Sequence, residues 1–299
     1  MGVSVVKKVI ERVYPFRRGR FYLQRMLIGA KNRRRVADFL SKRLPALPNK
    51  LLGGYLKERE DLEKQGFVMV RNLVKKCEVD EVVGWLKDKP VYDRWNKDGG
   101  VFLPDFPPHD CHTAPHLDAD IVNCPHLLRW ANDPQVLSIV GQVLGGKPTL
   151  SNVTAWWSYP GHTEPQQAEN FHRDVDDLHF IKLFVYLSDV DEESGPHVFV
   201  PGSHKCESFR KIRRYTDEEV TSFFGPEGIK YFIGEKGSAF LENTFGLHKG
   251  QLPKSKKRLL FQAQYSLGPI GIYEYSPIKR ANSGESIELD EYVNRLFVK

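Results

Sequence analysis

Residues 170–187, NFHRDVDDLHFIKLFVYL, are the most informative stretch of the chain, because a histidine and an aspartate lie two positions apart before a long apolar run. The run His179–Leu187 is rich in β-branched and aromatic residues, which is typical of a buried strand. Residues two apart in an extended backbone point to the same side, so His172 and Asp174 can reach one ion. We therefore predict a buried strand with a His–Asp ligand pair at its entrance.

Strand-like runs dominate the chain from residue 149 onward, separated by clusters of Gly, Pro, Asp and Ser. No helix regularly intervenes between these runs, which argues against a parallel sheet built from βαβ units. The predicted strands are 149–158, 179–187, 197–200, 229–233, 237–241 and 258–267.

Helical patterns precede these strands. One spans residues 79–86, and a second begins at Asp133-Pro134 and stops at Gly145-Gly146. Helices followed by many strands predict a β-rich α+β protein, a jelly roll with helices on its flank.

A second His-x-Asp motif, His116-Leu117-Asp118, serves as an internal control. It lies in a stretch rich in Pro and Gly, with no strand after it, so we favour His172 and Asp174 as the ligand pair. One further histidine would complete two imidazoles and one carboxylate on one side of a metal. That arrangement suits non-haem Fe(II), because it leaves the opposite positions open.

His248 is the candidate for the third ligand, because it sits at a turn after the strand-like run 237–241. Ten residues later Arg258 opens the last long strand. A buried arginine needs an anionic partner, and its planar guanidinium matches a carboxylate with two hydrogen bonds. We expect His248 to bind the metal and Arg258 to bind the far carboxylate of 2-oxoglutarate.

The order of these motifs resembles that of the phytanoyl-CoA dioxygenase family of Fe(II)/2-oxoglutarate oxygenases. Residues 65–70 are similar to the opening strand of that family, and the resemblance covers roughly residues 55–270. The motifs that carry it are the His172–Asp174 pair, Leu187-Ser188-Asp189, Glu193-Ser194-Gly195-Pro196, Pro201-Gly202-Ser203-His204-Lys205, His248 and Arg258.

This resemblance implies a double-stranded β-helix, the cupin-like form of the jelly roll. It implies Fe(II) held by His172, Asp174 and His248, with Arg258 binding 2-oxoglutarate, and O2 as the other co-substrate. The implied reaction is the hydroxylation of a small organic molecule by hydrogen abstraction, coupled to decarboxylation of 2-oxoglutarate to succinate and CO2. Some relatives have Gly or Ala in place of Asp174 and bind a halide, so its presence favours hydroxylation. Gly250 departs from the family pattern, which often has a small hydroxyl residue there.

Further residues are candidates for contacts with co-substrate or substrate. Gln262 shares a strand face with Arg258 if that strand is regular. Asn152 and Thr154 share a face with Trp156 on the strand 149–158, which makes them candidate cofactor-binding residues. For Trp156 itself we favour ordinary core packing over a role in the pocket wall.

The charge is unevenly distributed along the chain, whose formal net charge is +6. Residues 1–50 contain 14 of the 44 Lys and Arg residues but 2 of the 38 Asp and Glu residues. We therefore divide the chain into a basic helical extension, 1–50, and an oxygenase domain, 51–299.

Two apolar stripes with helical spacing, within residues 6–13 and 36–44, mark the extension. We favour packing of this arm on its own body or on a second subunit. Peripheral contact with an anionic membrane surface is the alternative. We expect no nucleic-acid binding, because no recognisable motif accompanies the basic residues. The sequence leaves the oligomeric state open.

The four cysteines form no CxxC pair, and the chain is too long for a disulfide scaffold, so we expect a reducing, cytoplasmic location. No apolar stretch approaches the roughly 20 residues of a membrane span. The start of the chain lacks the apolar core of a secretory signal.

Two other functions remain open from the sequence. One is a cupin-like, metal-dependent hydrolase or isomerase that uses zinc or manganese and does not need Arg258. The other is a catalytically silent jelly-roll interaction protein, recruited through residues 1–50.

Overall fold

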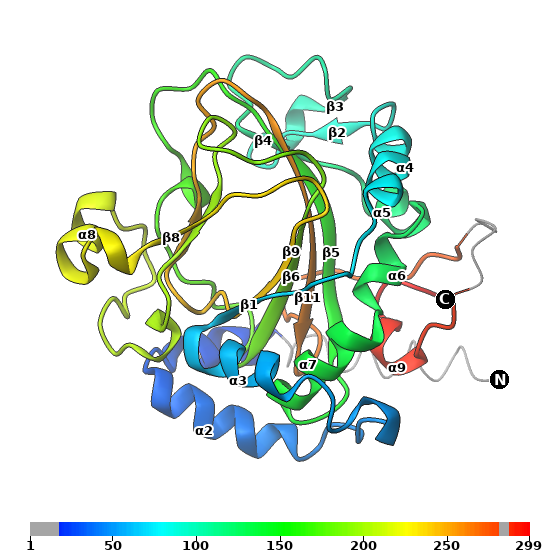
Figure 1. Cartoon of the computed structure of the whole chain (residues 1–299), viewed down its shortest axis with the longest axis vertical. Helices are drawn as coiled ribbons and strands as arrows, with labels where there is room; N and C mark the ends of the chain where they lie inside the picture. The colour runs from blue at the N-terminus through cyan, green and yellow to red at the C-terminus, as the bar shows by residue number, and fades with distance from the viewer. Residues whose placement is uncertain (1–17, 281–286) are drawn as a thin grey trace.

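The computed structural model describes residues 18–280 and 287–299, in which most strands belong to two antiparallel sheets (Figure 1). The larger sheet has the strand order β1-β9-β6-β11-β5-β4 and the smaller β10-β7-β8. The larger sheet contains β1 (Phe67–Met69), β4 (Thr113–Pro115), β5 (Thr149–Ser158), β6 (Phe180–Tyr186), β9 (Ala239–Glu242) and β11 (Arg258–Ser266). The smaller sheet contains β7 (His197–Phe199), β8 (Lys230–Phe232) and β10 (His248–Gly250), and a separate pair is formed by β2 (Val91–Tyr92) and β3 (Val101–Phe102).

Helices cover the larger sheet on the side away from the smaller one. In Figure 1, α2, α3 and α7 lie at the lower end of the molecule, while α8 projects on the opposite side from α4 and α5. Residues 18–26 are also helical. The α-helices are α2 (Ala30–Ser41), α3 (Leu56–Gln65), α4 (Lys76–Leu86), α5 (Asp118–Asn123), α6 (Leu127–Ala131), α7 (Pro134–Leu144), α8 (Asp217–Phe224) and α9 (Glu291–Asn294). The short 3-10 helices are η1 (Asn49–Leu51), η2 (Lys97–Gly99), η3 (Gln167–Glu169), η4 (Ser203–Lys205) and η5 (Pro226–Gly228).

Alternation along β6 divides its side chains between two cores. Leu183 and Val185 join the principal core beneath the helices. Phe184 and Tyr186 point the other way and pack with Phe199 of the smaller sheet. The space between the two sheets is therefore lined by the inner faces of β5, β6, β9 and β11, and this is where the functional residues lie.

The strand predictions are confirmed, since each predicted strand is present with ends that move by two residues at most. The long buried runs made these strands recognisable, because both faces of β6 and β11 are covered. All pairings between named strands in the described residues are antiparallel, as expected for a chain without βαβ units.

The second predicted helix also has the predicted ends. Asp133 caps α7 by accepting a hydrogen bond from the backbone nitrogen of Gln135 at 2.8 Å, with Pro134 in the first helical position. Gly145 ends the helix with a φ of 84°, in the left-handed region that glycine adopts without strain.

Within the basic extension, α2 packs on the body of the protein. Ala37 of α2 and the following Leu47 are buried in the principal core, whereas Phe39, which belongs to the predicted apolar stripe, is 60% exposed. The stripe within residues 6–13 lies outside the described residues. The division of the chain at residue 50 stays a prediction. Among the described residues, no helix has the length and apolar character needed to cross a bilayer.

Candidate active site

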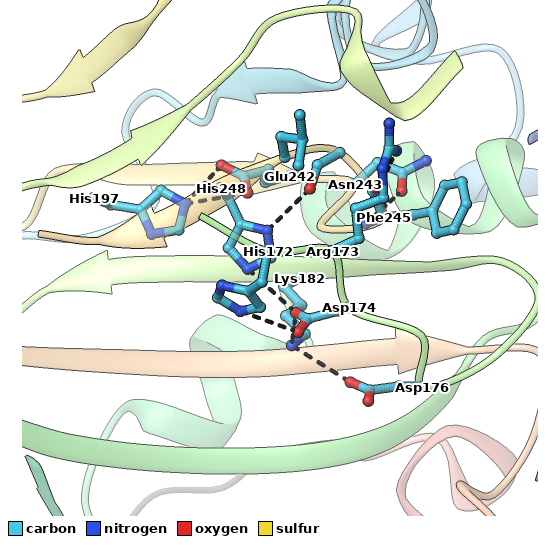
Figure 2. A network of polar contacts seen from close by, with 12 residues as sticks. His172, Arg173, Asp174, Asp176, Lys182, His197, Glu242, Asn243, Phe245 and His248 are labelled. Carbon is cyan, nitrogen blue, oxygen red and sulfur yellow. Dashed lines mark hydrogen bonds and ion pairs between the residues drawn. The ribbon is translucent and has the colours of Figure 1, made fainter. Parts of the chain in front are cut away.

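Three side chains from separate parts of the chain meet between the two sheets (Figure 2). His172 and Asp174 lie on the segment before β6, and His248 begins β10. His172 and His248 form an isolated antiparallel bridge, in which each backbone nitrogen donates to the carbonyl oxygen of the other residue at 2.9 and 3.0 Å. One nitrogen or oxygen atom from each of the three residues lies within 4.8 Å of the others.

The hydrogen bonds of the two imidazoles leave their inner nitrogens available. Nδ1 of His172 lies 2.9 Å from the carbonyl oxygen of Asn170, and Nδ1 of His248 lies 3.0 Å from that of Gly246. A carbonyl oxygen only accepts, so each Nδ1 carries the proton that it donates. The Nε2 atoms face Asp174, at 3.5 Å from Oδ1 for His172 and 3.4 Å from Oδ2 for His248.

Burial and neighbouring charges shift the pKa values of these three groups in different directions. Burial, with the nearby His248, lowers the pKa of His172 to about 4, so this imidazole is neutral at neutral pH. Burial alone would raise the pKa of Asp174, but Lys182 and His248 outweigh it and hold that pKa well below its ordinary range. Burial would likewise lower the pKa of His248, but Asp174 outweighs it and raises that pKa. The site thus offers an ionised carboxylate beside a neutral imidazole.

Lys182 points from the middle of β6 at the Asp174 carboxylate (Figure 2). Its Nζ lies 2.6 Å from Asp174 Oδ2 and 3.5 Å from Asp176 Oδ2, and its side chain is 9% exposed. Burial would lower the pKa of Lys182, but the two carboxylates outweigh it and raise that pKa, so the amine is charged. The lysine fixes one oxygen of the candidate ligand, as hydrogen-bonding partners of metal ligands commonly do.

We expect Lys182→Met to destabilise the metal-free protein by about 3–5 kcal/mol, because a buried ion pair loses its cation while the carboxylates remain. A divalent cation would replace the missing charge, so adding Fe(II) should raise the melting temperature of this variant more than that of the wild type. Thermal unfolding with a chelator and with Fe(II) measures both effects. Lys182→Arg, which keeps the charge, is the control; an equal gain from Fe(II) in Lys182→Met and wild type would refute this role.

A second buried pair lies behind His248. Nε2 of His197 lies 2.9 Å from Oε2 of Glu242, and Glu242 is completely buried. Burial raises the pKa of Glu242 to about 8 and lowers the pKa of His197 well below its ordinary value. At neutral pH Glu242 is therefore protonated and His197 is neutral, so the pair carries no net charge. It adds a polar but uncharged wall beside the three candidate ligands.

The pKa of Glu242 makes stability depend on pH. Because the folded protein binds this proton more tightly than the unfolded chain, the stabilisation is complete below about pH 4.5 and is lost as pH rises through about 8. Glu242→Gln keeps a neutral partner for His197 at every pH. We expect the melting temperature of Glu242→Gln, measured by circular dichroism, to rise relative to that of the wild type as the pH increases from 5 to 9. The exposed substitution Glu192→Gln should show no such trend, and a constant difference for Glu242→Gln would contradict the assignment.

A cavity of about 140 Å³ opens beside the three candidate ligands, and Arg258 lies in its wall. Nη2 of Arg258 donates to Oγ of Ser158 at 3.2 Å, while its buried Nε and Nη1 have no hydrogen-bond partner among the described residues. Unpaired buried donors are costly, and a bound anion would accept hydrogen bonds from these two nitrogens. A Cβ at Gly250 would lie 3.2 Å from Nη2, and the hydroxyl next to the arginine comes instead from Ser158.

The other sequence-predicted residues are placed as follows. Gln262 lines the cavity, two residues along β11 from Leu260, and Trp156 lines it from β5. Thr154 lies opposite Gln262 and Asn152 opposite Gln264 in the β5–β11 register, but neither Asn152 nor Thr154 is part of the cavity wall. Asn152 is hydrogen-bonded to Tyr273. Their role as cofactor-binding residues stays a prediction.

Sequence reasoning missed Lys182, the His197–Glu242 pair and Arg94. Lys182 could have been identified from its position in the apolar run FIKLFVY, because a charged residue on a strand buried on both faces needs a partner. Arg94 lies in the segment after β2, where no period was evident. It lines the same cavity, its Cζ lies 5.1 Å from the centre of the Trp156 ring, and its buried Nε has no hydrogen-bond partner in the described part of the chain.

The control motif is not part of the site. His116 is buried beside β2, where burial lowers its pKa to about 4, and Asp118 is the first residue of α5. Neither belongs to the group of ligand atoms formed by His172, Asp174 and His248.

The chain is similar to one described protein family. A family model described as phytanoyl-CoA dioxygenase matches residues 62–258. None of the curated proteins searched matches the chain.

Solved structures with a similar fold include HygX from Streptomyces hygroscopicus with nickel and 2-oxoglutarate bound, with a TM-score of 0.52 and 19% identity, covering 81% of this chain and 99% of that one. EctD from S. alaskensis with bound Fe has a TM-score of 0.51 and 15% identity, covering 86% and 93%. The non-haem alpha-ketoglutarate-dependent carbocyclase SnoK from nogalamycin biosynthesis has a TM-score of 0.52 and 16% identity, covering 74% and 87%. At these identities the likeness shows a shared fold.

Proposed function

This chain belongs to the phytanoyl-CoA dioxygenase family, and from that membership we propose that His172, Asp174 and His248 hold its iron and that Arg258 binds 2-oxoglutarate. The protein is an Fe(II)- and 2-oxoglutarate-dependent oxygenase. The observation that carries the residue assignment is the meeting of three ligand atoms within 4.8 Å, beside a cavity that also contains unpaired guanidinium nitrogens.

The residues present fit both groups. Two imidazoles whose Nε2 atoms face one carboxylate are the donor set of non-haem Fe(II) sites with open positions. The two buried, unpartnered nitrogens of Arg258 fit a carboxylate, which a guanidinium binds through two parallel hydrogen bonds. We assign the fold as the double-stranded β-helix of this family, for which the two facing antiparallel sheets are the support.

Bound iron, with 2-oxoglutarate and O2, supplies the oxidising chemistry that hydroxylates a C–H bond while 2-oxoglutarate becomes succinate and CO2. The chain contributes orientation and a dry pocket. The carbonyls of Asn170 and Gly246 fix the two imidazole rings, and Lys182 fixes the Asp174 carboxylate. Arg258 neutralises the co-substrate's far carboxylate. Apolar walls such as Phe184 and Leu260 exclude water from the same cavity.

We propose that the substrate is a small polar molecule with an anionic group. Arg94 and Gln262 both line the cavity, and the side-chain amide of Gln262, a residue 8% exposed, has no hydrogen-bond partner among the described residues. A buried amide and a guanidinium without hydrogen-bonding partners favour a ligand that can satisfy both. Four free cysteines, two of them buried, support action in a reducing compartment, for which we propose the cytoplasm.

Release of succinate from 2-oxoglutarate tests this function and its substrate class together. A panel should pair anionic molecules, such as sugar phosphates and amino-acid derivatives, with neutral counterparts. We expect anionic members to stimulate succinate release in the presence of Fe(II). Arg94→Met should raise their KM about tenfold or more, since loss of a charged hydrogen bond costs about 1.5–3 kcal/mol. Lys57→Met, an exposed change on α3, should leave the KM unaltered; equal stimulation by neutral counterparts would contradict the proposed class.

A further inference from the structure

A second cavity, of about 440 Å³, lies on the outer side of the larger sheet. It is bounded by α2, α3 and the residues that lead into β6, and Figure 1 shows α2 and α3 together at the lower end of the molecule. Ile181 and Lys182 are neighbours in a strand and point to opposite faces. Ile181 lines this cavity while Lys182 lines the iron cavity, so the two cavities lie back to back across β6.

The floor of this second cavity is apolar. Leu62 of α3, Val143 of α7 and Phe245 contribute to it, together with Leu178 and Ile181 before and within β6. Its volume falls within the range of about 300–1,000 Å³ that is typical of small-molecule sites. The cavity can therefore hold the body of an organic molecule.

The mouth of the cavity is positively charged. Five lysines and arginines line the cavity, but Arg33 is buried and bonded to Gln24, and Arg34 pairs with Glu63 at 3.6 Å. Lys31, Arg35 and Lys205 are exposed, and their side chains form no ion pair or hydrogen bond with another described residue. This local charge contrasts with the chain beyond residue 50, where 36 acidic residues outnumber 30 basic ones. The mouth is thus complementary to an anion.

His179 adds a polar group without a partner. Its side chain lines the cavity, the residue is 8% exposed, and its ring has no hydrogen-bond partner within the described residues. Burial, with the charge of Arg34, lowers the pKa of His179 to about 3, so the ring is neutral and has one N–H to donate. A ring N–H that lines a cavity and has no partner among the described residues can donate to a ligand oxygen.

We propose that this cavity binds an amphipathic organic anion, with its apolar body on the floor and its carboxylate held by the cationic mouth and His179. The occupant is a free molecule with one alkyl chain, because a cavity of about 440 Å³ accommodates a small organic molecule. The site is separate from the iron centre and does not depend on the function proposed for that centre.

Calorimetric titration of decanoate, below its micellar concentration, tests the site. The protein should be loaded with Fe(II) and 2-oxoglutarate without oxygen, so that Arg258 is already occupied. We expect one decanoate per chain. Decyltrimethylammonium, with the same chain and the opposite charge, and acetate, with the same carboxylate and no chain, should each bind at least tenfold more weakly.

Variants locate the binding. The double substitution Arg35→Glu with Lys205→Glu should weaken decanoate binding at least tenfold, and His179→Phe should weaken it as well. Lys42→Glu, which reverses a single charge at the end of α2 outside the cavity, should stay within twofold of wild type. Ala30→Trp should block the cavity from an accessible position on α2, and circular dichroism checks that each variant is folded.

Three results would overturn the proposal. Decanoate could fail to bind, the cationic amphiphile could bind as well as decanoate, or the double variant could bind decanoate as tightly as wild type, which would place the ligand elsewhere. Sedimentation with phosphatidylglycerol vesicles, in the absence of decanoate binding, would assign the positive charge to a membrane surface instead.

Discussion

Replacing His172 with alanine should abolish Fe(II) binding and with it all conversion of 2-oxoglutarate to succinate. Substitution of residues that merely support metal ligands costs about 10–100-fold in affinity or activity, so removal of a direct ligand should cost more than about 100-fold. The ring of His172 is fixed by its Nδ1 bond to Asn170, and no other imidazole nitrogen replaces it in the group. Metal content of the purified, iron-loaded variant and succinate release are the two measurements.

His116→Ala is the matched control, because His116 is also a buried histidine in a His-x-Asp motif. It lies outside the group of ligand atoms. We expect this variant, once shown to be folded, to bind iron as the wild type does. Iron binding that survives in His172→Ala but falls in His116→Ala would reverse the choice between the two motifs.

The second large effect is expected for Arg258→Met, which should raise the KM for 2-oxoglutarate by about 30-fold or more. Truncating one partner of a buried, hydrogen-bonded charge pair costs about 2–5 kcal/mol, and each 1.4 kcal/mol is a factor of ten. Fe(II) binding should be unchanged, because the guanidinium is not a metal ligand. Lys257→Met removes the neighbouring exposed charge and should have little effect on this KM.

Substrate analogues separate a specific role of Arg258 from a general loss of structure. 2-Oxopentanoate has the same chain as 2-oxoglutarate but lacks the far carboxylate. The wild type should strongly prefer 2-oxoglutarate, and Arg258→Met should lose that preference. A variant that still discriminates between the two compounds would show that another group binds the carboxylate.

Much of the fold could be read from the sequence because both faces of the central strands are buried. The runs that became β5, β6 and β11 are long, apolar and bounded by turn residues, so their type and ends were predictable. The short strands β4 (TAP) and β10 (HKG) were not, because neither lies in an apolar or aromatic run. They are defined by pairing with β5 and β7, which is a property of the folded chain.

The candidate site was predictable to the extent that its chemistry resides in motifs. His172 and Asp174 are two apart in an extended segment, and His248 and Arg258 occur at turn and strand boundaries. The contacts of Lys182 and Glu242 could not be predicted in this way. Lys182 meets Asp174 from across the site, and Glu242 meets His197 of the other sheet. Such pairs depend on how the two sheets face each other.

The packing of the basic extension was also predictable from the sequence only in part. Spacing predicted that residues 36–44 pack on the body of the protein or on a second subunit, and Val36, Leu40 and Leu44 do pack against the principal core. The pattern could not predict that Arg33 would be buried, where it donates to the carbonyl oxygen of Gln24 at 2.9 Å and to other oxygens nearby. A run of three arginines in a sequence indicates an exposed surface, and the fold separates them into one structural and two surface residues.

The position of the iron is the most direct test of the proposed ligands. Crystals grown without oxygen, with Fe(II) and 2-oxoglutarate, should show an anomalous peak at the iron absorption edge between Nε2 of His172, Nε2 of His248 and the Asp174 carboxylate, with the co-substrate's far carboxylate on Arg258. An iron peak at other residues, or co-substrate bound away from Arg258, would contradict the account.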